Sequence, residues 1–149
     1  MKAALTRANS VASFAIRGRV WQNWSHGLVI PSQGVAIDST FKLNGVRRRP
    51  LEEVLHGATA IRHLDYHLDR EAEAQDWLAD QIGTKYDIHC IVGFAFGDER
   101  DWRDDTSWFC WELVAAAIEK GSDYRFENLS RVTPRDLIRA ERVLAGFES

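Results

Sequence analysis

The sequence predicts a single folded domain, residues 1–149, that mixes α-helices with β-strands. Its apolar content of 45% and its six tryptophans supply enough material to bury a core in one domain of this length. Residues 25–41 alternate around a turn, as strands of a hairpin do, whereas residues 104–120 and 133–144 carry helix signals. These two patterns together predict the mixed class.

Short strands are favoured in the first part of the chain. Residues 2–6 are a candidate strand, and residues 11–20 have helical spacing. Residues 25–30 (SHGLVI) and 35–41 (VAIDSTF) both alternate, and residues 31–34 between them have turn chemistry. We therefore expect the two alternating segments to form a β-hairpin.

The middle of the chain predicts a loop, two helices and one further strand. The basic triplet at 47–49 precedes a proline and is interpreted as a solvated loop. Residues 50–56 favour a short helix, 58–66 a third strand and 69–82 a helix that Gly83 ends. Residues 86–96 form a short apolar run that periodicity alone does not assign.

A cysteine lies at the start of the helix predicted over residues 104–120. Asp105, Thr106 or Ser107 can act as its N-cap, and Gly121 suits its end. Most of its faces are apolar, which predicts a buried helix. Cys110 lies where the helix dipole favours a negative charge, so a thiolate nucleophile is one interpretation, and a small buried hydrophobic residue is the other.

The last predicted helix begins at the segment TPRD, residues 133–136. Thr133 is a suitable N-cap, Pro134 suits the first helical position, and Asp136 can complete a capping box. Apolar residues at 137, 140, 143 and 144 give this helix one buried face.

A cysteine nucleophile needs a base, and the base needs an orienting partner. His26 is the candidate base because it lies in a strand beside a glycine, and Asp38 is the acidic residue of the next strand. If Ile30 pairs with Val35, His26 faces Ser39 and Asp38 points away. If Ile30 pairs with residue 34, His26 lies opposite Asp38, and a one-residue slip or a bulge decides between the two registers.

Charge and composition exclude several classes of function. The net charge of −3 gives no general attraction to nucleic acid or anionic membranes. Cys90 and Cys110 are too few for a disulfide framework, and no apolar run approaches the roughly 18 residues of a transmembrane segment. The N-terminal residues lack a signal-peptide pattern, so we expect a protein that is cytoplasmic at synthesis.

A metal site is a rival interpretation. His63 and His67 would share one face of a helix, with Asp65, His89 and Cys90 as further ligands. The segment HLDYH lacks the glutamate of the zinc-protease motif, so surface or packing histidines are the preferred interpretation. We expect neither a metal nor another cofactor.

Taken in order, the motifs resemble the permuted papain-like amidases, which are YiiX-type relatives of the NlpC cell-wall peptidases. In that family the histidine motif precedes the cysteine motif, the reverse of ordinary papain-like proteins. The resemblance covers roughly residues 3–137. The segments that carry it are SHGLVI, VAIDSTF, NGVRRRPLEEVL, Gly83 with Tyr86-Asp87, WFCWELVAAAIEKG and TPRDL.

The resemblance implies an α+β, circularly permuted papain-like (NlpC-like) fold, with a small antiparallel sheet packed against a buried Cys-bearing helix. It implies Cys110 as nucleophile, His26 as general base and then acid, and Asp38 as the residue that orients His26. It also favours a helix over residues 86–96. Trp111 stands where the family often has serine, and Asp38 where it often has glutamate.

The implied function is that of a cysteine hydrolase or amidase, and the substrate stays open. A peptide or peptidoglycan amide is one candidate, with action at the cell envelope. An acyl lipid or thioester is another, because permuted members also resemble lecithin retinol acyltransferase. A third interpretation is a non-catalytic papain-like binding module of a phage or of the cell envelope. The sequence does not indicate the oligomeric state.

Overall fold

The computed structural model describes residues 1–9, 23–86 and 107–147, and it has the α+β class that the sequence predicts. Within these residues, five strands form one antiparallel sheet in the order β4-β3-β2-β1-β5. The strands are β1 (Lys2–Ala8), β2 (His26–Ser32), β3 (Val35–Thr40), β4 (Gly45–Pro50) and β5 (Ala58–Asp65). A separate parallel pair joins β6 (Lys85–Tyr86) to β7 (Ser107–Trp108).

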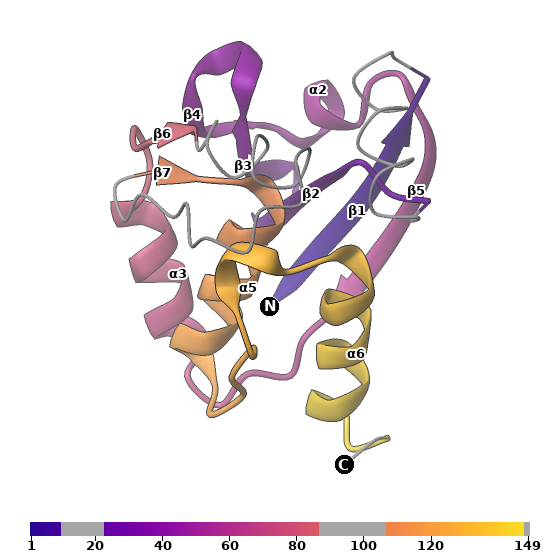
Figure 1. Cartoon of the computed structure of the whole chain (residues 1–149). Helices are drawn as coiled ribbons and strands as arrows, with labels where there is room; N and C mark the ends of the chain where they lie inside the picture. The colour runs from indigo at the N-terminus through magenta and orange to yellow at the C-terminus, as the bar shows by residue number, and fades with distance from the viewer. Residues whose placement is uncertain (10–22, 87–106, 148–149) are drawn as a thin grey trace.

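The helices gather around one central member. The described helices are α2 (Leu51–Leu55), α3 (Glu71–Asp80), α5 (Cys110–Gly121) and α6 (Pro134–Leu144), and the 3₁₀ turns are η1 (Phe41–Leu43) and η2 (Leu129–Arg131). Helix α5 packs against β2 and β3 and also contacts α3 and α6. Figure 1 shows α3 and α6 on opposite sides of α5. The helix that bears Cys110 is therefore at the centre of the described packing, and it is buried, as the sequence predicts.

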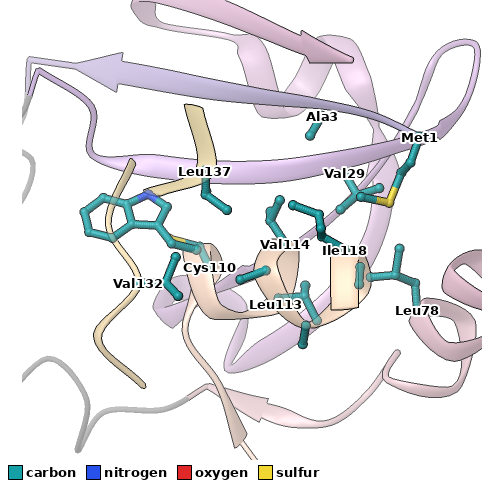
Figure 2. Packing of buried hydrophobic residues seen from close by; sticks show 14 of the residues in the cluster. Met1, Ala3, Val29, Leu78, Cys110, Leu113, Val114, Ile118, Val132 and Leu137 are labelled. Carbon is teal, nitrogen blue, oxygen red and sulfur yellow. The ribbon is translucent and has the colours of Figure 1, made fainter. Parts of the chain in front are cut away.

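Alternation along the strands divides the core between the two faces of the sheet. One face contributes Ala3, Val29 and Ile37, which cluster with the buried residues of α5. The other face contributes Ala4, Leu28 and Ala36, which pack with residues of α2. Figure 2 shows the larger cluster, with Leu78 toward the Ile118 end of α5 and Val132 toward its Cys110 end. Each large apolar side chain buried in this way contributes roughly 1.5–3 kcal/mol.

Most of the predicted elements are confirmed, but the loop predicted at 47–49 is wrong. Those three arginines lie in β4, which pairs with β3 along its whole length. β4 is an edge strand of the described sheet, so Arg48 can point into solvent without leaving the ladder. The loop was predicted from charge. Charge does not distinguish a loop from an edge strand, because both accept charged side chains.

The cysteine helix begins later than predicted. Its N-cap is Phe109, in extended backbone, rather than a residue from 105–107. Ser107 belongs to β7, while 105 and 106 lie outside the described residues. The Glu112 carboxylate accepts a hydrogen bond from the Phe109 N–H at 3.4 Å, which supplies the cap from within the helix. Cys110 is consequently the first residue of α5.

Both registers considered for the hairpin are wrong. Leu28 lies opposite Asp38, and the pairing shifts before Ser32 meets Val35 at the turn. Pro31 lies within the shifted interval and has no N–H to donate, which interrupts the regular ladder there. The irregularity that the sequence allowed is present, and it sets a register that neither alternative described.

Two predicted segments lie outside the described residues, namely the helix at 11–20 and nearly all of 86–96. Among the helices that the structure describes, none combines the length and the apolar character needed to cross a membrane.

Candidate active site

His26 is the first residue of β2, and the glycine that follows it lets α5 come close. A Cβ atom on Gly27 would lie 2.9 Å from Cδ1 of Trp111 and 3.6 Å from the carbonyl oxygen of Cys110. A larger residue at position 27 would require the Trp111 ring to shift, while the Cys110 carbonyl oxygen already lies at ordinary contact distance. The small residue beside the histidine thus brings the cysteine helix next to the candidate base.

Asp38 is a diagonal neighbour of His26 across the hairpin. Because Leu28 lies directly opposite Asp38, His26 is one step away on the same face, within reach of a long side chain. Nε2 of His26 donates a hydrogen bond of 2.8 Å to Oδ2 of Asp38. The Asp38 side chain is 0% exposed and the His26 side chain 25% exposed. The predicted pair therefore meets, although through a different register.

Arg49 completes the surroundings of Asp38, and it was not among the residues that the sequence singled out. Its Nε donates to Oδ1 at 3.1 Å and its Nη2 to Oδ2 at 2.7 Å, a two-pronged contact with one carboxylate. Nη1 of the same guanidinium donates to Oε1 of Glu53 at 3.0 Å. A prediction of residues 45–50 as a strand paired with β3 would have made Arg49 a candidate. In that pairing Arg47 lies opposite Asp38, so Arg49 lies on the same face of the sheet as Asp38.

These contacts lower the pKa of Asp38. Burial by itself raises the pKa of this carboxyl group, but hydrogen bonds from His26 and Arg49, together with their charges, outweigh that effect. Asp38 is consequently held as a carboxylate, the form that accepts a hydrogen bond from an imidazole N–H.

Cys110 is the second side chain that interacts with His26. It is a free cysteine, 2% exposed, and it interacts with His26 through a side-chain hydrogen bond and through its charge. Burial lowers the pKa of His26, but the Cys110 charge and the hydrogen bonds to Asp38 and Cys110 raise the pKa to about 10. The imidazolium form is thus stabilised between a carboxylate and a sulfur.

Trp111 forms the wall beside the cysteine. Its ring meets that of Phe109 edge to face, with centroids 5.1 Å apart. The indole Nε1 is buried and has no hydrogen-bond partner in the described part of the chain. An unpaired buried donor has a cost, so the tryptophan is held here by packing rather than by polar contacts.

The rival metal site loses its geometric basis. His63 lies in β5, and His67 follows the strand, so the two do not share a helix face as the hypothesis required. Both side chains, and that of Asp65, are exposed, while His89 and Cys90 lie outside the described residues. No group of three or more possible metal ligands occurs among the residues that the structure covers.

A cleft of about 770 Å³ lies between residues 124–132 and α6. Tyr124, Phe126 and Arg139 line it together with other residues, but His26, Asp38 and Cys110 do not. The cleft is therefore not the space above the candidate nucleophile.

Comparison of the chain with protein-family models gave no match, and comparison with curated proteins gave none.

Proposed function

We propose that this protein is a cysteine hydrolase of the circularly permuted papain-like type, which cleaves an amide or ester through Cys110, His26 and Asp38. One observation carries the proposal: a single imidazole contacts a buried carboxylate at 2.8 Å and the sulfur at the start of α5. A nucleophile, a base and an orienting group that contact one another in this order make up a catalytic triad.

The first half-reaction forms a thioester. His26 holds the proton that leaves the Cys110 thiol, and the sulfur attacks the carbonyl carbon of the substrate, forming a C–S bond. Because Nε2 is engaged with Asp38, Nδ1 is the ring nitrogen available for this proton. Backbone N–H groups at the start of α5 are suitable donors to the developing oxyanion. The imidazolium then protonates the departing amine or alcohol as its bond to the carbonyl carbon breaks.

Water completes the reaction. His26 accepts a proton from the attacking water, a C–O bond forms, and the C–S bond breaks with return of the proton to sulfur. The products are a carboxylic acid and the free thiol, so the cycle consumes one water and needs no cofactor.

A thiol-directed experiment tests the nucleophile. The full chain is treated with a small electrophile such as iodoacetamide, and the modified residue is located by mass spectrometry. We expect labelling of Cys110 that Cys110→Ser abolishes, that Cys90→Ser preserves, and that His26→Ala slows by at least about a hundredfold. Equal labelling of Cys110 in wild type and His26→Ala would contradict the pairing and favour the non-catalytic binding module.

A second experiment distinguishes the substrates. Wild type and Cys110→Ala are incubated separately with peptidoglycan peptides and with lipid esters, and products are identified by mass spectrometry. A cell-wall peptide amide is the proposed substrate, so we expect peptide cleavage by wild type alone. Cleavage of lipid esters alone would support the acyl hydrolase or acyltransferase alternative.

A further inference from the structure

We propose that Arg49 is a positioning residue of this site, which holds the Asp38 carboxylate in the orientation that accepts the His26 proton donor. The inference rests on the proposed function, and it assigns a role to a side chain outside the Cys-His-Asp set. Arg49 acts through Asp38 and does not touch the reacting atoms.

The geometry of the carboxylate leads to this assignment. Asp38 is fully buried, so water cannot fix its orientation or stabilise its charge. Arg49 contacts both oxygens, and Oδ2 is shared between Arg49 at 2.7 Å and His26 at 2.8 Å. A planar guanidinium bound to both oxygens prevents rotation of the carboxylate about its Cβ–Cγ bond. Rotation would carry Oδ2 away from the imidazole.

Glu53 anchors Arg49 from the solvent side. Its Oε1 accepts from Nη1 at 3.0 Å, and it lies on α2, the short helix that directly follows β4. The Arg49 side chain is only 19% exposed, so its methylene stem is enclosed while its head group bridges two acids. Groups that can carry opposite charges therefore alternate along the series His26, Asp38, Arg49 and Glu53, in which Asp38 is fully buried and Glu53 is exposed.

The other charged groups around Asp38 do not replace Arg49. Arg47 is directly opposite Asp38 in the β3–β4 register, but its Nη1 donates to the Val46 carbonyl at 2.9 Å. Across from β2, the group on α5 that faces His26 is Cys110, which interacts with the imidazole. Arg48, between the two other arginines, is exposed and supplies a matched control.

Removal of the Arg49 guanidinium should shift the pH dependence of Cys110 reactivity in one direction. Asp38 would lose two of the three hydrogen bonds that described side chains donate to its carboxylate, so protonation of its carboxyl group would occur at higher pH. Below that pH the neutral acid no longer stabilises the imidazolium, and the reactivity of Cys110 falls. The acid limb of the reactivity profile should move upward, by roughly one to three pH units.

The test uses the full chain in a Cys90→Ser background, so that Cys110 is the thiol measured. Its rate of alkylation by iodoacetamide is followed from pH 4 to pH 9 in three variants. We expect Arg49→Gln to move the acid limb upward, Arg49→Lys to restore it in part, because lysine keeps the charge without the fork, and Arg48→Gln to overlay the parent profile. Melting temperatures are recorded for each variant.

An unmoved acid limb in Arg49→Gln overturns the proposal, and a lowered melting temperature with an unmoved limb makes Arg49 merely structural. A second measurement needs no reaction: the NMR signal of the His26 Nε2–H is followed against pH. We expect that signal to be lost at higher pH in Arg49→Gln than in Arg48→Gln during acid titration. If Cys110 proves unreactive in the parent protein, the hydrolase proposal fails while this NMR comparison still decides the role of Arg49.

Discussion

His26 is the residue on which the proposed chemistry depends, because Asp38 and Cys110 both stabilise its protonated form. Asp38 accepts its Nε2–H at 2.8 Å. Burial lowers the pKa of His26, and the Cys110 charge is the largest of the influences that raise it. We expect Cys110→Ala to lower the pKa of His26 from about 10 toward the ordinary histidine value. NMR titration of the histidine ring signals measures this directly.

The control and the contradicting result are both simple. Cys90→Ser should leave the His26 titration where it is, whereas an identical titration in Cys110→Ala would show that the sulfur does not interact with the ring.

The pH dependence of the free energy of unfolding also follows from this shift. Since the pKa is raised on folding, the stabilisation from His26 is complete below about pH 6.5 and is lost as the pH rises through about 10.

At the scale of elements, the start of β4 is held closely against the segment that precedes β6. Gly45 has φ +130°, and a Cβ atom there would lie 1.9 Å from the Thr84 carbonyl oxygen. That oxygen accepts the Val46 N–H at 2.9 Å, and the Gly83 N–H donates back to the Val46 carbonyl at 2.9 Å. The edge strand is thus joined to the segment before β6 by backbone contacts that leave no room for a side chain.

We therefore expect Gly45→Ala to lower the free energy of unfolding by roughly 3 kcal/mol or more, because it adds a backbone clash to an unfavourable φ. Gly57→Ala is the matched control, since Gly57 also has a positive φ but a Cβ atom added there would meet nothing within 4 Å. That variant should lose only about 1–2 kcal/mol. Urea denaturation measures both, and equal losses would contradict the role of the Thr84 contact.

At the scale of the whole molecule, α5 joins the sheet to α3 and α6, so its packing should determine the stability of the fold. Ile118 is fully buried within that cluster, whereas Ile82, just after α3, is exposed. We expect Ile118→Ala to cost roughly 2–5 kcal/mol and Ile82→Ala less than about 1 kcal/mol. Denaturation followed by tryptophan fluorescence and by circular dichroism measures both, and coincident curves are the outcome expected of one domain. A similar loss in the two variants would contradict a core centred on α5.

Local signals account for what could be predicted from sequence. The start of α6 is an example: Asp136 Oδ2 accepts from the Thr133 N–H at 2.9 Å and from its hydroxyl at 2.7 Å, as the segment TPRD predicts. Strand alternation and helix spacing act over a few residues, so they indicate element types well. The choice of His26, Asp38 and Cys110 as candidates likewise needed only residue types, local context and motif order.

What the sequence by itself determined about this protein is the kind of each confirmed element, and it also supplied the candidate side chains of the proposed site. Only the tertiary structure decided how Leu28 pairs with Asp38, that the arginine triplet forms an edge strand, and that Arg49 holds the buried carboxylate. The physical reason is the distance along the chain over which each signal acts. Periodicity and capping depend on neighbours along the chain, whereas register, burial and the meeting of a sulfur with an imidazole depend on segments brought together by packing.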